Sequence, residues 1–344
     1  MSALFDIDLA DASTFPSRRT EAWKYSDLRR YLREAPQPSP TAAIGAPGPF
    51  YDLGGEAIVF ANGRAVGVTD FIASGEQTLR LRYISDAQGT GHTASARVAA
   101  RAGARLLLLE THEGAGSAYV AHNTLELDVA AGAEVTRVVL VEEPEDALSI
   151  AQAQVRVEAG GVFRQTVIAT GARLQRVETR IDHHARGAHV QADGLYLLNG
   201  ARQADLTSVV RHLDRDGTTS QLIKGVARDT ARGVFQGKIV VRPGAQKTDG
   251  YQLNRALLLS DQAEIDSKPE LEIYADDVKC AHGATVGQLD EQARYYMAAR
   301  GLPPETARKL LVRAFLGDAF VALEDEEESE RLMDVALGKL DKHL

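Results

Sequence analysis

The chain has 344 residues, of which 44% are hydrophobic and 25% are charged, and its formal net charge is −9. This composition predicts a folded, globular protein that buries a core without disulfide or metal support. It argues against a generic nucleic-acid binder, which would carry a basic stripe, and no stretch approaches the roughly 20 apolar residues of a membrane span.

The first region, residues 1–95, is predicted to be a mixed helical and extended segment. A helix is expected around Thr20–Arg33, because Trp23, Leu28 and Leu32 form a plausible apolar stripe. A proline-rich connector follows it. Two short strands are then expected, at Ala57–Ala61 and Leu79–Ile84.

The second region, residues 96–287, shows β-type alternation broken by glycines. Leu125, Leu127 and Val129 alternate with acidic residues, and Val155 and Val157 alternate with Arg156 and Glu158. The turns between such runs recur about every 27–28 residues, at Gly132, Gly160 and Gly187. This regular spacing favours a β-solenoid, with a β-sandwich or a jelly roll as the alternative.

The third region, residues 288–344, is predicted to be helical. A helix is expected to begin near Pro303 and Pro304, and apolar residues then recur at helical spacing. Large apolar side chains around Leu311, Phe315 and Phe320 are candidate interface anchors, with ordinary helix packing as the alternative. An acidic run, 324–328, is expected to be a solvated face, and Leu332–Leu340 to form one more helix.

Signatures of common enzymes are missing from the sequence. It contains no phosphate-binding P-loop, no G-x-S-x-G elbow and no H-E-x-x-H zinc motif. Cys280 is the sole cysteine, so neither an internal disulfide nor a C-x-x-C pair can form. With no basic secretory n-region at the N-terminus, these features lead us to expect a cytoplasmic protein without ATPase or thiol–disulfide activity.

One constellation suggests metal chemistry. If the β-pattern continues through residues 278–282, then Val278, Cys280 and His282 share one face of a strand. A thiolate and an imidazole are competent ligands for soft metals, but protein metal sites usually take three or four. Either a partner completes the site, or Cys280 and His282 are packing residues.

The remaining histidines give weaker signals. His183 and His184 are neighbours and therefore point to opposite faces of a strand, so a metal site with the nearby His189 is a weak hypothesis. Structural roles are expected for the scattered histidines, His92, His112 and His122.

An ordered string of motifs between His212 and Arg300 resembles the SufB/SufD family of iron–sulfur cluster assembly proteins. The string includes Lys224-Gly225-Val226, Val234-Phe235-Gln236-Gly237-Lys238-Ile239, Ala245-Gln246-Lys247-Thr248-Asp249, Lys268-Pro269-Glu270-Leu271-Glu272-Ile273 and Ala275-Asp276-Asp277-Val278-Lys279-Cys280-Ala281-His282-Gly283-Ala284-Thr285. Ala281 departs from the pattern, in which serine is commoner. Thr20-Glu21-Ala22-Trp23-Lys24-Tyr25 is also similar to the opening of SufD-type chains.

Within this resemblance, three features point to the SufD branch rather than the SufB branch. The chain is short for SufB, Asn254 stands where SufB-type chains are expected to carry cysteine, and Gly283 stands where they are expected to carry glutamate. A thiol and a carboxylate can both bind a cluster, so this chain should supply fewer ligands than a SufB partner.

The resemblance implies a mainly β fold, namely a right-handed parallel β-helix flanked by an N-terminal α/β region and a C-terminal helical domain. It implies a non-catalytic scaffold in complex with SufB and the ATPase SufC, which docks on the C-terminal helices. The metal-site residues would be His282 first and Cys280 second, at the SufB interface. The isolated chain is expected to hold no cofactor; a transient iron–sulfur cluster, and a flavin as a further candidate, belong to the complex.

Two alternatives stay open at this point. The chain could be a self-associating β-helix scaffold without SufB, and its exposed strand edges favour a homodimer when it is isolated. It could also be a β-helix polysaccharide-processing enzyme, although aromatic residues, at 6%, are sparse for a sugar-binding groove. Co-purification with an ATPase supports the assembly scaffold, and activity on acidic polysaccharide supports the enzyme.

Overall fold

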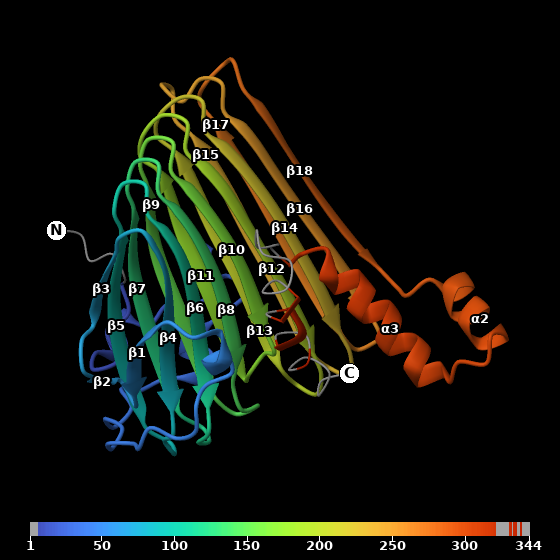
Figure 1. Cartoon of the computed structure of the whole chain (residues 1–344). Coiled ribbons are helices and arrows are strands. Elements are labelled where there is room, and N and C mark those ends of the chain that lie inside the picture. Colours follow the sequence, from blue (N-terminus) through green and yellow to red (C-terminus); the bar gives the residue numbers. More distant parts are fainter. Residues whose placement is uncertain (1–5, 321–329, 332, 336–337, 339–344) are drawn as a thin grey trace.

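The computed structural model describes residues 6–320, 330–331, 333–335 and 338. Two parallel sheets wind together as a solenoid, and short helices flank it in the described chain (Figure 1). The predicted parallel β-helix core is therefore confirmed. The β-sandwich and jelly-roll alternatives are wrong, because both are built from antiparallel sheets.

The ten-stranded sheet has the order β18-β16-β14-β12-β10-β8-β6-β4-β1-β2. Its strands are β1 (Glu56–Ala61), β2 (Arg64–Val66), β4 (Glu76–Ser85), β6 (Arg105–Gly114), β8 (Glu134–Glu142), β10 (Val162–Ala169), β12 (His189–Leu198), β14 (Thr218–Ala227), β16 (Asp249–Leu258) and β18 (Lys279–Gly287). The eight-stranded sheet has the order β17-β15-β13-β11-β9-β7-β5-β3. Its strands are β3 (Asp70–Ala73), β5 (Gly91–Ala100), β7 (Val120–Val129), β9 (Leu148–Val157), β11 (Leu174–His183), β13 (Gln203–His212), β15 (Arg232–Val241) and β17 (Glu264–Ile273).

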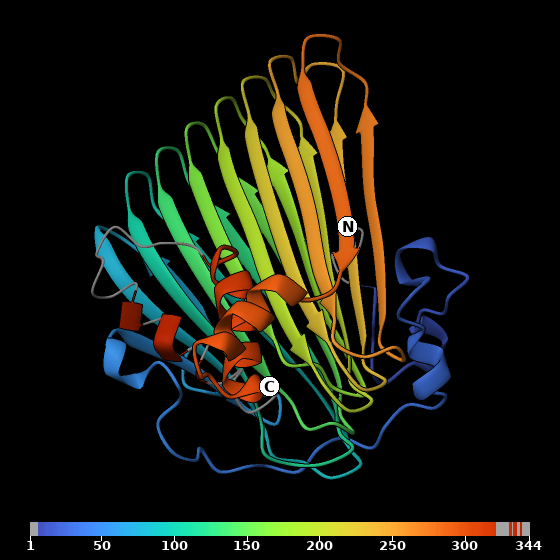
Figure 2. The ribbon, with the colours of Figure 1, turned by 90° about the vertical axis from the view of Figure 1, so that its right-hand side faces the viewer.

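From β3 onward, successive strands alternate between the two sheets, so each turn of the solenoid adds one strand to each sheet (Figure 2). Every strand pair among the described residues is parallel except β1–β2. Because the strands stack in register, a residue lies beside the residue at the same position of the next turn. Val177 thus pairs with Leu206, and His183 with His212.

The turns explain the glycine spacing. At one corner of the solenoid, a residue with positive φ donates its N–H to a carbonyl of the next turn. These residues are Gly103, Gly132, Gly160, Gly187, Asp216 and Lys247, with φ between 60° and 71°. Glycine adopts this conformation without strain, whereas Asp216 and Lys247 each bear roughly 1 kcal/mol of it. The repeat therefore continues beyond the last glycine that reveals it in the sequence.

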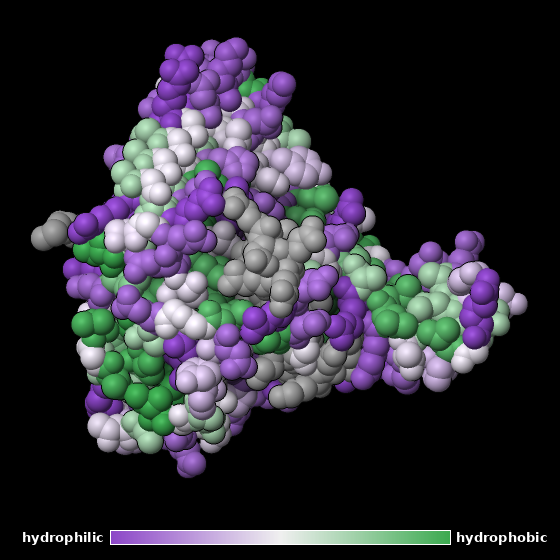
Figure 3. Space-filling model, in the orientation of Figure 1, coloured by the Kyte–Doolittle hydropathy of each residue, from purple (hydrophilic) through white to green (hydrophobic). Residues whose placement is uncertain are grey.

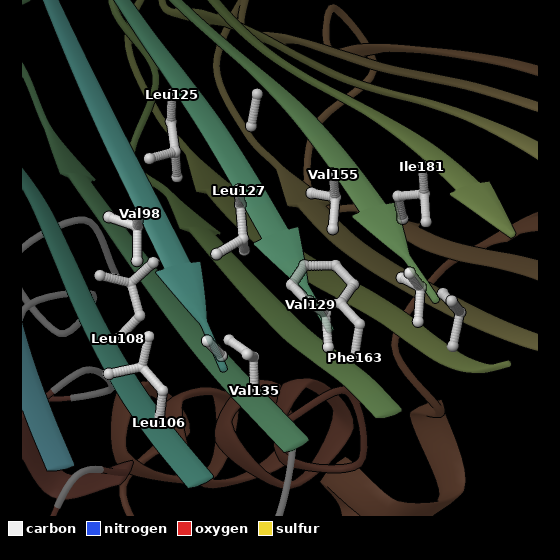
Figure 4. Packing of buried hydrophobic residues seen from close by; sticks show 14 of the residues in the cluster. Val98, Leu106, Leu108, Leu125, Leu127, Val129, Val135, Val155, Phe163 and Ile181 are labelled. Carbon is white, nitrogen blue, oxygen red and sulfur yellow. The ribbon is translucent and has the colours of Figure 1, made fainter. Parts of the chain in front are cut away.

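Apolar side chains from both sheets fill the interior (Figure 4). Leu125, Leu127 and Val129 point inward from β7, and Val155 and Val157 do so from β9. The alternation predicted from the sequence is therefore confirmed, and the charged residues between them, Glu126, Asp128 and Arg156, lie on the outer face.

A buried polar cluster interrupts this apolar interior. The Arg137 guanidinium donates to Glu110 Oε2 from Nε and Nη2, at 2.9 and 2.8 Å, and from Nη1 to Gln165 Oε1 at 2.6 Å. The Glu110 Oε1 atom lies 2.8 Å from His112 Nε2. Burial raises the pKa of Glu110, but the Arg137 charge and the His112 hydrogen bond outweigh it and lower the pKa to about 2. The cluster is thus a buried ion pair.

The N-terminal segment packs on the outer face of the eight-stranded sheet, and the predicted helix at Thr20–Arg33 is wrong as one element. The structure has instead the short 3-10 helices Ala12–Thr14 and Glu21–Trp23, the four-residue helix α1 (Leu28–Tyr31), and later the 3-10 helix Tyr51–Leu53. Trp23 and Leu28 are both buried there, as their apolar character predicted.

Contacts with the sheet hold this segment in a non-helical path. The Gln203 side chain donates a hydrogen bond to the Tyr25 carbonyl at 2.9 Å, and the Ser26 hydroxyl donates to Asp205. The Trp23 ring lies against the guanidinium group of the fully buried Arg176, whose Cζ atom is 4.2 Å from the ring centroid. The Tyr25 carbonyl and the Ser26 hydroxyl thus have hydrogen-bond partners on the sheet, so this segment does not need a continuous helix to satisfy them.

The solenoid begins earlier than residue 96, because β1, β3 and β4 already belong to its parallel ladders. After β18 the chain forms α2 (Glu291–Ala299) and α3 (Pro304–Gly317), the latter beginning at the predicted proline. The acidic run 324–328, and Leu332, Ala336 and Leu340 of the last expected helix, lie outside the described residues. Within the described residues, no helix has the length and apolarity to span a membrane.

Candidate functional site

Cys280 and His282 lie on β18, the terminal strand of the ten-stranded sheet (Figure 1). Their register partners on β16 are Gly250 and Gln252, both of which are buried inside the solenoid. Cys280 and His282 therefore face inward, on the same side of the strand, as their spacing predicted. No described strand continues the sheet beyond β18, so this inward face is open to solvent at one end.

Cys280 is half-buried and packs against the apolar interior. Its Sγ atom lies 3.5 Å from the position that a Cβ on Gly250 would occupy. Burial raises the pKa of the Cys280 thiol, and Asp249 adds to this while the Gly250 backbone opposes it. The isolated chain thus keeps Cys280 as a neutral thiol, a weaker metal ligand than the thiolate.

His282 is exposed at the open end of the solenoid. On the neighbouring strand β16, Gln252 is the register partner of His282, and Asn254 is the next residue whose side chain also points into the solenoid. Both side chains are fully buried, and their amide oxygens have no hydrogen-bond partner among the residues described. The imidazole therefore lies next to two buried amide groups and remains accessible to an approaching partner or metal.

The described part of the chain contains no group of three or more His, Cys, Asp and Glu side chains placed to hold a metal ion. Asn254 and Gly283 stand where SufB-type chains are expected to carry a cysteine and a glutamate. Asn254 points inward, whereas Gly283 lies on the opposite side of β18. The metal-ligand roles of Cys280 and His282 stay predictions that depend on ligands from elsewhere.

Five of the seven other histidines in the described residues are buried in the solenoid. His183 is buried and His184 is exposed beside Glu158, as their adjacent positions predicted. His92, His112 and His122 are buried and hydrogen-bonded, which agrees with structural roles. His189 contacts Thr218, so these residues form no shared metal centre in the described chain.

His183 and His212 form a buried pair that inspection of single motifs missed. Their rings stack with centroids 3.9 Å apart, and each Nε2 lies 2.9 Å from the Thr219 hydroxyl. The sequence signal that could have revealed this pair is the separation of the two histidines by one turn of the solenoid, which places them in register. Burial lowers the pKa of His212 to about 4 and that of His183 well below its usual value.

Acidification is expected to destabilise the solenoid through this pair. The unfolded chain, with histidine pKa values near 6.5, binds more protons than the folded chain as the pH falls below 6.5. Stability is therefore lost progressively until the folded pKa, about 4 for His212, is reached. Between pH 7.5 and 5.5 we expect His212 alone to lower the free energy of unfolding by about 1 kcal/mol.

Urea unfolding at the two pH values checks this expectation. The His212→Gln variant should lose about 1 kcal/mol less than the wild type over this interval. His184→Gln, which removes an exposed histidine, is the control for the loss of a histidine outside the buried pair. Equal pH dependence in the wild type and His212→Gln would contradict the assignment.

Helix α3 covers part of the outer face of the ten-stranded sheet. Val312 and Leu316 of α3 are buried against that face, and Phe320 is buried with them. The buried Lys224 of β14 donates to the Phe315 carbonyl and to Asp318, both at 2.6 Å. This bond anchors the end of α3 to the sheet.

The three predicted docking residues differ in access. Leu311 and Phe315 are half-buried, whereas Phe320 is occupied by packing within the chain. Sequence reasoning did not select the most exposed apolar residues of these helices. They are Tyr295, Tyr296 and Leu310, exposed by 78%, 59% and 46%. Figure 3 shows apolar side chains on the protruding helical end of the molecule.

Comparison with known proteins agrees with these features. Residues 83–315 match the family described as "SUF system FeS cluster assembly, SufBD core domain". The chain is 27% identical to the iron–sulfur cluster assembly protein SufD of Escherichia coli, over 92% of this chain and 88% of that protein. It is 33% identical to SufD of Bacillus subtilis, over 41% of this chain and 32% of that protein.

A SufBD family protein of Synechocystis is 35% identical over 56% of this chain, and the match spans 43% of that relative. The family match covers most of the solenoid, including β18, and then α2 and most of α3. The chain therefore belongs to the SufB/SufD family of iron–sulfur cluster assembly proteins.

Proposed function

We propose that this chain is a scaffold subunit, without catalytic activity of its own, on which an iron–sulfur cluster is assembled together with a SufB partner. The observation that carries the proposal is the placement of Cys280 and His282 on the open, inward face of the terminal strand β18. Thiolate and imidazole suit iron, but two ligands are too few for a cluster. A partner at this end would bring further ligands within reach.

The unequal ligand supply supports SufB as that partner. Where SufB-type chains are expected to carry cysteine and glutamate, this chain has Asn254 and Gly283. The cluster would then be the cargo of the interface, held chiefly by the partner's groups and by His282. A homodimer would bring together two copies of His282 and Cys280, but it would lack the cysteine and glutamate that SufB-type chains are expected to carry at the positions of Asn254 and Gly283.

We assign the docking of the ATPase SufC to the C-terminal helices. Tyr295, Tyr296 and Leu310 present apolar surface, and Leu311 and Phe315 are half-buried beside it. Exposed aromatic residues of this kind commonly anchor protein interfaces. The packing of Val312 and Leu316 on the sheet would carry a displacement of α3 to the solenoid.

Replacing Tyr295 and Leu310 together, by alanine and serine, is expected to weaken ATPase binding by about tenfold or more, because interface anchors contribute several kilocalories per mole. Pull-down with tagged SufC, quantified by titration, measures this loss. Tyr274→Ala, which removes an exposed tyrosine from the turn between β17 and β18, is the matched control.

Point variants test the docking more sharply than removal of residues 290–344. That deletion should abolish ATPase binding too, but it would also uncover the apolar outer face under Val312 and Leu316. Unchanged affinity in the Tyr295→Ala/Leu310→Ser variant, together with unchanged affinity in Leu311→Ser, would remove the docking assignment.

A further inference from the structure

The N-terminal segment carries a basic surface on a chain that is acidic overall. Residues 17–33 contain six cationic and two anionic side chains, a formal charge of +4, whereas the whole chain has −9. All six cationic side chains are exposed, namely Arg18, Arg19, Lys24, Arg29, Arg30 and Arg33. The exposed Arg173, from the turn between β10 and β11, lies beside them. We call these seven residues the basic patch.

The cations of the basic patch lie close together in space. The Arg29 N–H donates to the Pro16 carbonyl at 3.1 Å, which brings the first two arginines of the segment next to α1. Arg30 and Arg173 both stack on the ring of Tyr31, with their Cζ atoms 5.7 and 5.4 Å from its centroid. In Figure 2 this segment, in dark blue, forms a compact block beside the solenoid. The cations therefore gather around α1.

The basic patch is not neutralised by the described part of the chain. None of its seven side chains forms an ion pair with a carboxylate of the described residues. The two carboxylates of the same stretch are engaged elsewhere, because Glu21 binds Lys268 of β17, and Asp27 accepts the Arg30 N–H at the start of α1. Neighbouring cations without counter-charges repel one another, so an anionic partner would be attracted to this surface.

Contacts with the sheet hold the basic patch in place from below. Trp23 lies against the buried Arg176, the Ser26 hydroxyl donates to Asp205, and Leu28 is fully buried. The segment that carries the cations is therefore anchored on both sides of Lys24 and directly beneath α1. A surface that is ordered before it binds loses little conformational entropy when a partner arrives.

We propose that the basic patch is the docking surface for an acidic segment of another protein. Six of its seven cations are arginines, and a guanidinium pairs with a carboxylate through two parallel hydrogen bonds. Several such pairs on one ordered surface would give attraction and a fixed orientation together. The patch lies on the outer face of the eight-stranded sheet, whereas α3 lies on the ten-stranded sheet. This partner would therefore not compete with one bound to the C-terminal helices.

Two other anionic partners fit this surface less well. A nucleic acid needs a basic track along its backbone, and outside this compact patch the chain is acidic and repels phosphates. A surface that binds a membrane exposes apolar anchors, whereas Phe15, Trp23 and Leu28 of this segment are buried. A short stretch of aspartate and glutamate side chains meets the patch without either conflict.

Charge reversal with a matched control tests the proposal. The patch variant is Arg29→Glu/Arg30→Glu, and the control variant is Arg101→Glu/Arg242→Glu. The control replaces two exposed arginines in turns of the solenoid and changes the net charge by the same amount. The probe is a fluorescein-labelled oligoglutamate peptide, titrated into the full-length protein at two salt concentrations. We expect the patch variant to bind it about tenfold or more weakly than the wild type, and the control to stay within about twofold.

A zero-length cross-link locates the bound peptide. A carbodiimide activates a carboxylate, which then forms an amide with an amine in contact with it. We expect the wild type to be linked to the peptide through Lys24, and the patch variant to lose this link. Higher salt should weaken both the binding and the link, because exposed charges are screened. A melting curve shows that each variant is folded, and Arg18→Glu/Arg33→Glu replaces the patch variant if that one does not fold.

The following results would overturn the proposal. Equal affinity for the peptide in the wild type and the patch variant would show that the basic patch does not bind it. Tighter binding of a single-stranded oligonucleotide of equal charge would assign the surface to nucleic acid, and tighter binding of vesicles that contain phosphatidylserine would assign it to a membrane. Self-association of the wild type, lost in the patch variant, would make a second copy the occupant. None of these results depends on SufB or SufC, so the proposed function is tested separately.

Discussion

Replacing His282 by alanine is expected to reduce the yield of iron–sulfur cluster in the reconstituted complex by about tenfold or more, since a removed ligand can seldom be replaced in a shared site. The melting temperature of the isolated subunit should stay within about 2 °C of the wild type, because His282 is exposed and exposed substitutions change stability little. Cluster absorbance and iron content after reconstitution measure the yield.

Two companion variants sharpen this result. Cys280→Ser should have a smaller effect if the partner supplies the main thiolate, because burial keeps the Cys280 thiol neutral. His184→Ala removes another exposed histidine and should leave cluster yield unchanged. A normal yield from a stable His282→Ala complex would show that the histidine has no role as a ligand.

Replacing Arg137 by methionine is expected to destabilise the folded chain by about 3–5 kcal/mol, since it leaves the Glu110 carboxylate buried without its cation. Both side chains are 2% exposed and lie inside the solenoid. The free energy of unfolding of a domain is about 5–15 kcal/mol in total. A loss of this size could therefore leave much of the protein unfolded at 37 °C. Urea unfolding followed by circular dichroism measures the change.

The double variant Glu110→Gln/Arg137→Met separates charge from packing. It removes the uncompensated carboxylate, so we expect it to recover more than half of the loss. The surface pair Arg156–Asp128, whose side chains are 42% and 56% exposed, is the control. Arg156→Met should cost less than about 1 kcal/mol. If the double variant is no more stable than Arg137→Met, the loss is one of packing rather than of charge.

The turns of the solenoid show which part of the repeat could be recognised from the sequence and which part could not. Gly132, Gly160 and Gly187 reveal the repeat, because glycine is the residue that adopts a left-handed turn without strain. The same corner is formed by Asp216 and Lys247 in later turns, where tertiary hydrogen bonds hold a non-glycine residue in that conformation. A pattern of residue types cannot show where such bonds override local preference.

The N-terminal segment shows the opposite case. Its apolar spacing predicted a helix, and the burial of Trp23 and Leu28 follows from their hydrophobicity alone. The path of the chain was decided by partners far away in the sequence, such as Gln203 for the Tyr25 carbonyl. Short helices have little stability of their own, so contacts of this kind determine whether they form.

Three features could be predicted from the sequence: the fold class, the shared face of Cys280 and His282, and membership of the SufB/SufD family. Alternation, turn residues and an ordered string of motifs are patterns of residues close together in the sequence, so they can be recognised without the tertiary structure. Three other features follow from the folded chain alone: β18 is the last described strand of its sheet, His183 stacks on His212, and Phe320 is buried while Tyr295 is not. These outcomes depend on which turns of the solenoid meet and on which face a helix covers, and both are set by long-range packing.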